Sequence, residues 1–232
     1  MANNDNRYIV ILASGTGTRF GGETPKQFVS IGGRTIIEHT LLACDNGLFN
    51  EIILVVAYEF IDRVSEMLRS GNYKTRIRIV AGGASRKESC KRGVAAINEC
   101  EREARVVIHN GVQPFVSKDY FERCLNALEK YEAVTSGLPA IYTVLQVNEN
   151  HEIVAIPDRR TLYCDMGVEC FRLSLLRKLF SKYDDDVSTD IVGMVFRSGL
   201  AKVFVAEGES SNIKITHSED LFFAEKLLKG KE

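Results

Sequence analysis

Apolar segments with the character of β-strands alternate along this chain with segments of helical spacing. The strand-like segments are continuously apolar and lie at Tyr8–Leu12, Ile52–Ala57, Ile77–Ala81, Val106–His109, Ala133–Gly137 and Val203–Ala206. Helical patterns lie at Ile36–Ala43, Glu59–Leu68, Arg86–Asn98, Lys118–Lys130, Leu173–Tyr183 and Ser218–Lys229, the last opening on a capping serine. Strands that are apolar on both faces are typical of a mostly parallel sheet covered by helices on both faces. The sequence therefore predicts an α/β fold.

Three loops follow strands of this pattern, so they are expected to meet at the edge of the sheet where such folds bind ligands. The first is rich in glycine, which lets the backbone approach a ligand and form a phosphate-sized concavity of N–H groups. Arg19 and Lys26 follow it and would supply positive charge. This loop predicts a nucleotide site formed by Ala13, Ser14, Gly15, Thr16 and Gly17.

The other two loops hold further candidate residues. Gly82 and Gly83 permit close approach to a base or ribose, and Ser89 offers a hydroxyl one helical turn later. Arg86 is expected to read a base edge or to belong to the start of the following helix. Alone, this segment would be an ordinary strand-to-helix turn. Its expected place beside the glycine-rich loop favours a nucleotide-binding role. The third loop spans 109–115.

Composition excludes several classes of partner. The 232 residues include 30 basic and 31 acidic side chains, for a net charge of −1, so no affinity for nucleic acid polymers is indicated. Because we find neither a signal peptide nor an apolar run of ~18 residues, we expect a cytoplasmic protein without a membrane partner. The six cysteines form no CxxC pair and no zinc spacing, so we expect reduced, structural residues.

Residues 140–162 depart from the alternating pattern. Two short strand-like stretches, Tyr142–Val147 and Ile153–Ile156, flank a plausible hairpin tip at Asn148–Asn150. A hairpin without a core of its own is marginally stable in isolation. We therefore expect a protruding arm that packs on a partner, for example a second copy of the chain; the alternative is a hairpin lying on its own domain.

Seven motifs in order carry a family resemblance that spans almost the whole chain. They are Ala13–Phe20, Pro25-Lys26-Gln27, Gly32-Gly33 with Ile36–Thr40, Gly82–Arg86, His109–Pro114, Asp158-Arg159 and Asn212–Thr216. Together they resemble 2-C-methyl-D-erythritol 4-phosphate cytidylyltransferase and its relative ribitol-5-phosphate cytidylyltransferase. The resemblance implies a single nucleotidyltransferase domain over 1–232 with a Rossmann-like fold, and a homodimer formed through the 140–162 arm.

The resemblance also implies the reaction and the roles of residues. CTP would transfer CMP to 2-C-methyl-D-erythritol 4-phosphate, in isoprenoid biosynthesis, or to a related polyol phosphate such as ribitol 5-phosphate, releasing pyrophosphate. Mg²⁺ would be the cofactor, bridging phosphate oxygens with few protein ligands, and we name no metal-ligating residue. The implied catalytic residues are Arg19, Lys26 and Lys214. The implied acceptor-binding residues are Asn110, Gln113, Arg159 and Thr189.

Departures from the family pattern gather on the acceptor side. Where the family usually reads His-Asp-Ala-Ala-Arg-Pro, this chain has Asn110 and Gln113 in place of the acid and the arginine. The arm's usual Asp-Thr-x-Lys is missing, and the Gln-Thr-Pro-Gln region reads Asp165-Met166-Gly167-Val168-Glu169. The CTP-side loops are nearly intact. This contrast predicts retained nucleotide chemistry with an altered acceptor site.

Two alternatives from other classes remain at this point. One is a nucleotide-binding protein that has lost catalysis, motivated by Asn110 and Gln113. The other is an NAD-type oxidoreductase using the Gly15-x-Gly17 turn. Phe20 stands where the third glycine of the dinucleotide pattern would be, and the Lys26 and Lys214 motifs also argue against it.

Overall fold

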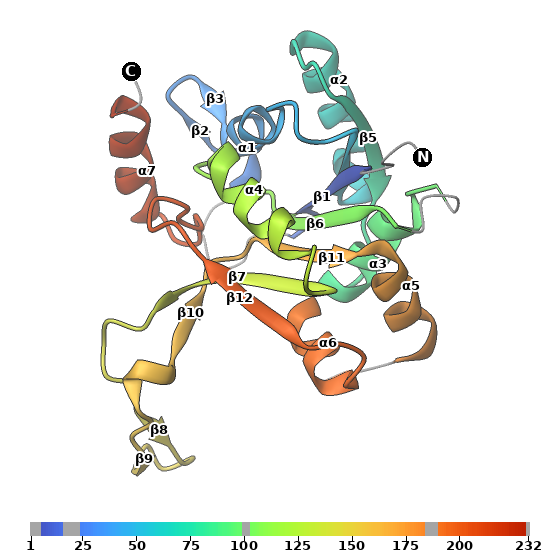
Figure 1. Ribbon diagram of the computed structural model, residues 1–232. Helices are drawn as coiled ribbons and strands as arrows, with labels where there is room; N and C mark the ends of the chain where they lie inside the picture. Colours follow the sequence, from blue (N-terminus) through green and yellow to red (C-terminus); the bar gives the residue numbers. More distant parts are fainter. Residues whose placement is uncertain (1–5, 16–23, 99–102, 184–189, 231–232) are drawn as a thin grey trace.

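A mixed sheet of eight strands forms the centre of the molecule (Figure 1). The structure is a computed structural model and describes residues 6–15, 24–98, 103–183 and 190–230. The strand order is β10-β7-β11-β6-β1-β4-β5, with β12 beside β7. The bounds are β1 Arg7–Ala13, β4 Glu51–Val56, β5 Arg76–Ala81, β6 Arg105–Asn110, β7 Ala133–Pro139, β10 Tyr163–Asp165, β11 Glu169–Arg172 and β12 Val203–Glu207. Strands β6, β1, β4 and β5 are parallel, as their continuous apolar sequences predict.

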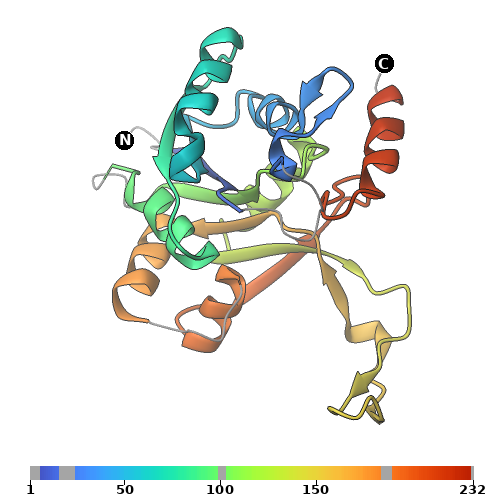
Figure 2. The ribbon, with the colours of Figure 1, turned by 180° about the vertical axis from the view of Figure 1, so that it is seen from behind.

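Helices cover both faces of this sheet (Figure 2). Their bounds are α1 Ile36–Cys44, α2 Ile61–Ser70, α3 Arg86–Ala95, α4 Lys118–Ala127, α5 Leu173–Lys182, α6 Ile191–Ser198 and α7 Asp220–Lys229. Helices α1, α2 and α4 pack on one face, where Ile9 and Ile11 of β1 point. Helices α3, α5 and α6 pack on the other, where Tyr8 and Val10 point. Successive residues of one strand thus bury both faces of the sheet.

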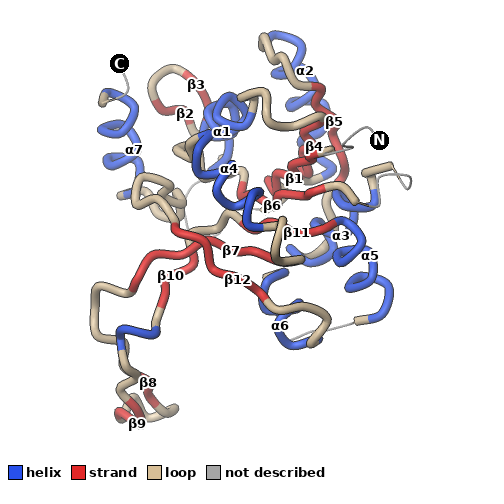
Figure 3. Tube along the Cα trace, viewed as in Figure 1, coloured by secondary structure: helices blue, strands red, loops and turns tan. Residues whose placement is uncertain are grey.

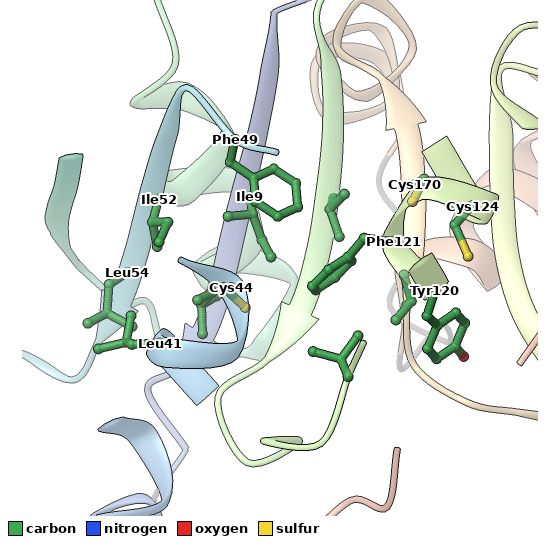
Figure 4. Packing of buried hydrophobic residues seen from close by; sticks show 14 of the residues in the cluster. Ile9, Leu41, Cys44, Phe49, Ile52, Leu54, Tyr120, Phe121, Cys124 and Cys170 are labelled. Carbon is green, nitrogen blue, oxygen red and sulfur yellow. The ribbon is translucent and has the colours of Figure 1, made fainter. Parts of the chain in front are cut away.

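The first of these two cores is formed by aliphatic and aromatic side chains from the sheet and its helices (Figure 4). Phe49 and Phe121 meet edge to face with ring centroids 5.2 Å apart. Cys44 and Cys124 are buried thiols in it, and Cys90 lies in the opposite core, as expected of structural cysteines. Burial raises the pKa of Cys44 and of Cys90 well above the ordinary range, which keeps both thiols protonated.

The remaining cysteines divide into three cases. Cys170 is a further buried thiol, whereas Cys164 on β10 is exposed, so the expectation of structural burial is wrong for Cys164. Its strand lies at the edge of the sheet and pairs only along one side, with β7. Cys100 lies outside the described residues. No helix in the described ranges has both the length and the apolar character needed to span a membrane.

Several elements differ from the sequence prediction. Strand β11 is antiparallel to β6 and β7, and helix α6 lies between α5 and β12, although neither β11 nor α6 has a distinctive pattern. Helices α3 and α4 end three residues earlier than predicted, at Ala95 and Ala127. Helix α7 begins at Asp220, and the expected cap by Ser218 is wrong, because Glu219 stands at the N-cap position and no side chain caps the helix. The Asp220 carboxylate instead accepts the backbone N–H groups of Thr216 and His217 in the preceding turn.

The hairpin predicted at 140–162 projects from the sheet as an arm (Figure 1; Figure 2). Figure 3 shows its short strands, β8 Gln146–Val147 and β9 Ile153–Ala155, at the far end. Asn148 shapes the tip by accepting the N–H groups of Asn150 and Glu152 at 3.0 Å. Because the arm extends away, the alternative of a hairpin lying on its own domain is wrong.

Candidate active site

A cavity of about 610 Å³ lies where β1, β4, β5 and β6 end. The parallel strands bring their carboxyl ends to one edge, so loops distant in sequence share its wall. Its lining residues are Leu12, Ala13, Ser14, Gly15, Lys26, Gln27, Ala57, Tyr58, Glu59, Gly82, Gly83, Ala84, Ser85, Arg86, Ser89, Asn110, Val112 and Lys214. The structure therefore brings together most of the residues that the sequence singles out.

Two of the loops fit against each other through a serine pair. The hydroxyl oxygens of Ser14 and Ser89 are 2.9 Å apart, and Ser89 Oγ also accepts the N–H of Gly83 at 3.0 Å. A Cβ added at Gly82 would lie 2.5 Å from Cβ of Ser14. Glycine is required there because the second loop approaches the first so closely. The pair fixes the relative position of the two predicted nucleotide loops.

Gln27 attaches a cationic segment to the glycine-rich loop. It is buried in the short 3₁₀ helix η1, Lys26–Phe28, and its Nε2 donates to the carbonyl oxygens of Ala13 and Gly15, both at 3.1 Å. Lys26, its neighbour, lines the cavity. Gln27 belongs to the Pro25-Lys26-Gln27 motif, but the sequence alone assigned it no role. Its position next to Lys26 is the signal that indicates a role in placing the lysine.

The start of α3 places Arg86 at the cavity wall. Ser85 caps the helix by accepting the Glu88 N–H at 3.1 Å, so Arg86 is the first helical residue. Its Nη2 donates to Oε1 of Glu169 on β11 at 3.0 Å. Burial raises the pKa of Glu169 to about 7 despite the opposing charge of Arg86. The sequence did not indicate this pairing.

Asn110 and Gln113 bind each other directly. Asn110 Nδ2 donates to Gln113 Oε1 at 2.6 Å, while Gln113 Nε2 donates to the carbonyl oxygens of Met166 and Asn212. Gln113 is 2 % exposed and is absent from the cavity wall, whereas Asn110 lines it. The family's acid and arginine are thus replaced here by a neutral, hydrogen-bonded amide pair, henceforth the amide pair.

Gly167 permits this arrangement. Its φ is +78°, and a Cβ built on it would lie 2.5 Å from Oε1 of Gln113. A side chain at this position would displace the amide pair and would also strain the backbone. Gly167 and the amide pair therefore depend on each other sterically.

Lys214 reaches the cavity from the other end of the sequence. The N–H of Ile215 donates to the carbonyl oxygen of Val112 at 2.9 Å, which joins the 212–216 segment to the loop after β6. Asn212 is fully buried and its Nδ2 donates to the carbonyl oxygen of Met166 at 3.0 Å. These two anchors lie on either side of Lys214 in the sequence, and Lys214 itself lines the cavity.

The remaining predicted residues lie elsewhere. Arg159 is on the arm in the 3₁₀ helix η3, Arg159–Thr161, where it is exposed and its Nη1 donates to the carbonyl oxygen of Ile141. It does not line this chain's cavity. Thr16, Gly17, Arg19 and Thr189 lie outside the described residues, so their predicted roles are not tested.

The donor set at the cavity fits a magnesium ion that arrives on a triphosphate. Glu59 is the one carboxylate among the described residues lining it. In the described parts of the chain, no three His, Cys, Asp or Glu side chains gather as a metal site would require. Mg²⁺ is commonly held by substrate phosphates, waters and one or two carboxylates. The predicted cofactor is therefore compatible with this wall, on which two lysines would face phosphate charge.

A strand-end cavity lined by glycine loops and lysines, on this α/β sheet, defines the class of the protein as a nucleotidyltransferase of Rossmann-like fold. The family model of 2-C-methyl-D-erythritol 4-phosphate cytidylyltransferase matches residues 8–230. The chain belongs to this family. The NAD-type oxidoreductase alternative is thereby wrong, and the resemblance drawn from the motifs is confirmed.

Individual relatives agree with the family. The 2-C-methyl-D-erythritol 4-phosphate cytidylyltransferase of Syntrophus aciditrophicus is 34% identical over 227 residues, covering 96% of each chain. The bifunctional ribulose 5-phosphate reductase/CDP-ribitol pyrophosphorylase of Haemophilus influenzae is 31% identical, covering 98% of this chain and 49% of its own. This chain thus spans about half the length of the bifunctional relative.

Solved structures give the same result. The 4-diphosphocytidyl-2C-methyl-D-erythritol synthase of Anaerococcus prevotii superimposes with a TM-score of 0.82 at 28% identity, covering 98% of this chain and all of that one. The 2-C-methyl-D-erythritol 4-phosphate cytidylyltransferase of Francisella tularensis superimposes with a TM-score of 0.78 at 26% identity, covering 96% and 99%. The predicted α/β fold, with its mixed sheet, is confirmed.

Proposed function

We propose that this chain is a CTP-dependent cytidylyltransferase that transfers CMP to a phosphorylated polyol and releases pyrophosphate. The observation that carries the proposal is one cavity whose wall holds both glycine loops, Lys26, Lys214 and Asn110. The acceptor is 2-C-methyl-D-erythritol 4-phosphate or a related polyol phosphate such as ribitol 5-phosphate, since both kinds of relative match nearly the whole chain.

In this reaction an acceptor phosphate oxygen attacks the α-phosphorus of CTP in line. A new P–O bond forms as the bond to the β-phosphate breaks, and the electron pair leaves on pyrophosphate. The nucleophile is already ionised, so catalysis consists mainly of positioning and charge stabilisation. Lys26 and Lys214 would neutralise charge that grows on the phosphates. Mg²⁺, when bound with the triphosphate, would supply further neutralisation of the phosphate charge.

The proposal extends to the assembly. We propose a cytoplasmic homodimer in which the arm reaches the partner's active site, with Arg159 contributing to acceptor binding there. Two observations support this dimer. Arg159 is exposed and does not line the cavity of its own chain, and apolar side chains along the arm are exposed to solvent. The exposed fraction is 73 % for Ile141 and 78 % for Tyr142, more than a stable isolated hairpin would leave uncovered.

Pyrophosphate release from CTP and Mg²⁺ tests the function. The panel of acceptors is 2-C-methyl-D-erythritol 4-phosphate, ribitol 5-phosphate and several other polyol and sugar phosphates, with Lys214→Ala as the inactive control. Turnover with one acceptor would establish the activity and its pathway. CTP binding without turnover across the panel would favour the second candidate, a binding protein that has lost catalysis, which the neutral amide pair motivates.

A further inference from the structure

A buried carboxylate lies directly behind the nucleotide-facing wall of the cavity. Glu169, the first residue of β11, is 2 % exposed and accepts a hydrogen bond from Arg86 at 3.0 Å. Arg86 lines the cavity, whereas Glu169 does not. Arg86 is therefore the direct side-chain contact between Glu169 and the cavity wall.

The ion pair restricts a side chain that would otherwise move freely. An arginine has roughly 2 kcal/mol of rotamer entropy, and a single buried partner can hold its planar group in one orientation. The pair carries a free-energy cost, because Arg86 Nη1 and Glu169 Oε2 are both buried and find no hydrogen-bond partner among the described residues. Since a buried ion pair is weak evidence for stability, orientation of Arg86 is the better physical reason for it.

Glu169 also joins the nucleotide side of the site to the acceptor side. It is aligned with Ile108 of β6, two residues before Asn110. On its own segment it follows Gly167, against which the amide pair packs. The short segment 167–169 thus contacts the amide pair at one end and Arg86 at the other.

We infer that Glu169 is a positioning residue for Arg86, holding the guanidinium in the orientation that binds the nucleotide. This inference rests on the proposed function, because it needs CTP in the cavity. It assigns to Glu169 an effect on CTP affinity and little effect on the transfer step. It also requires that Glu169 has no effect on affinity once Arg86 is removed.

A double-mutant cycle tests the inference by calorimetric binding of Mg·CTP and by steady-state kinetics. Glu169→Ala and Arg86→Ala should each weaken CTP binding about tenfold, the loss of one charge-assisted hydrogen bond. The double variant should bind no more weakly than the worse single variant. Glu169→Gln, which keeps an acceptor for Arg86, should remain within about threefold of the original protein. The turnover number at saturating CTP should change less than about threefold in Glu169→Ala.

A second ion pair with a buried carboxylate supplies the control. Glu51 accepts hydrogen bonds from Arg78 at 3.0 Å, and neither residue lines the cavity. Glu51→Ala should therefore lower the urea concentration at the midpoint of unfolding and leave CTP affinity unchanged. If Glu169→Ala does not fold, Glu169→Leu replaces it, and the same loss of CTP affinity is expected. Unchanged CTP affinity in the Glu169 variant, additive losses in the double variant, or a loss confined to turnover would overturn the inference. Failure of the unaltered protein to bind CTP would instead refute the proposed function.

Discussion

At the scale of single residues, the amide pair joins two neutral side chains where the family pattern has an acid and an arginine. Asn110 and Gln113 make a direct side-chain hydrogen bond between the two ends of the loop, at 2.6 Å. Gln113 satisfies both hydrogens of its amide group on backbone carbonyls. An amide pair needs no charge balance, so it survives in a site where Gln113 is almost fully buried.

Restoring one charge without the other should therefore destabilise the protein. We expect Gln113→Arg alone to lower the free energy of unfolding by about 3 kcal/mol, because it buries a charge with no acid beside it. The double variant Asn110→Asp with Gln113→Arg should recover at least half of that loss. Urea unfolding of the two variants measures this difference. Equal stability of both would show that the two positions do not act as a pair.

Lys26 is the residue whose replacement should affect the chemical step most directly. Lys26→Ala should lower turnover about 10²-fold or more, since it removes a fixed positive charge on which the transition state would depend. Lys91→Ala, which removes an exposed lysine of α3 that does not line this cavity, is the matched control. Steady-state kinetics with saturating CTP separate the effects. A change only in apparent CTP affinity would contradict the assigned role.

At the scale of elements, the arm has few contacts within its own chain that would stabilise it. Its base is attached by the N–H of Ala140, which donates to the carbonyl oxygen of Leu162 at 2.9 Å. Beyond that, β8 and β9 pair only with each other, and most of their side chains are exposed. Two strands alone are marginally stable in water, so the arm is suited to packing on another surface.

Mixed dimers test whether the arm completes the partner's site. Chains carrying Arg159→Ala and chains carrying Lys214→Ala should each be inactive as homodimers. When mixed and allowed to exchange, they should recover partial activity, because one of the two sites then has both residues. The measurement is pyrophosphate release as a function of mixing ratio. Absence of recovery, with subunit exchange verified, would favour a site built within a single chain.

At the scale of the whole molecule, the sheet buries one histidine completely beneath the loop that carries the amide pair. His109 on β6 donates from Nε2 to the carbonyl oxygen of Gln113 at 2.9 Å and packs edge to face on Phe121. Burial lowers the pKa of His109 from 6.5 to about 4. The folded protein therefore holds this imidazole neutral at pH values where the unfolded chain protonates it.

The consequence is a specific dependence of stability on pH. Between pH 6.5 and pH 4 the unfolded chain binds more protons than the folded one, so the contribution of His109 is present above pH 6.5 and is lost as the pH falls toward 4. From pH 7 to pH 5, the unaltered protein should lose about 2 kcal/mol of unfolding free energy relative to His109→Gln. Urea titrations at both pH values measure this. Parallel losses in the two proteins would contradict a neutral His109.

Local sequence determined the class of fold and the place of the site. Continuous apolar runs identify strands buried on both faces, and a glycine loop after such a strand must lie at the ligand-binding edge. For this reason Ser14, Lys26 and Gly82 could be predicted at one site, while the family resemblance added Lys214 from the other end of the chain, and all four line one cavity. The motif around Lys26 also identified the family.

Only the tertiary structure decided which distant side chains meet. Glu169 acquired a partner because β11 lies antiparallel beside β6, a neighbour that no local pattern specifies. Gln27 acquired its role through two carbonyl groups of another loop. Burial is encoded in the periodicity of nearby residues, whereas a hydrogen bond between segments depends on the order and direction of strands, which is settled by the packing of the whole sheet.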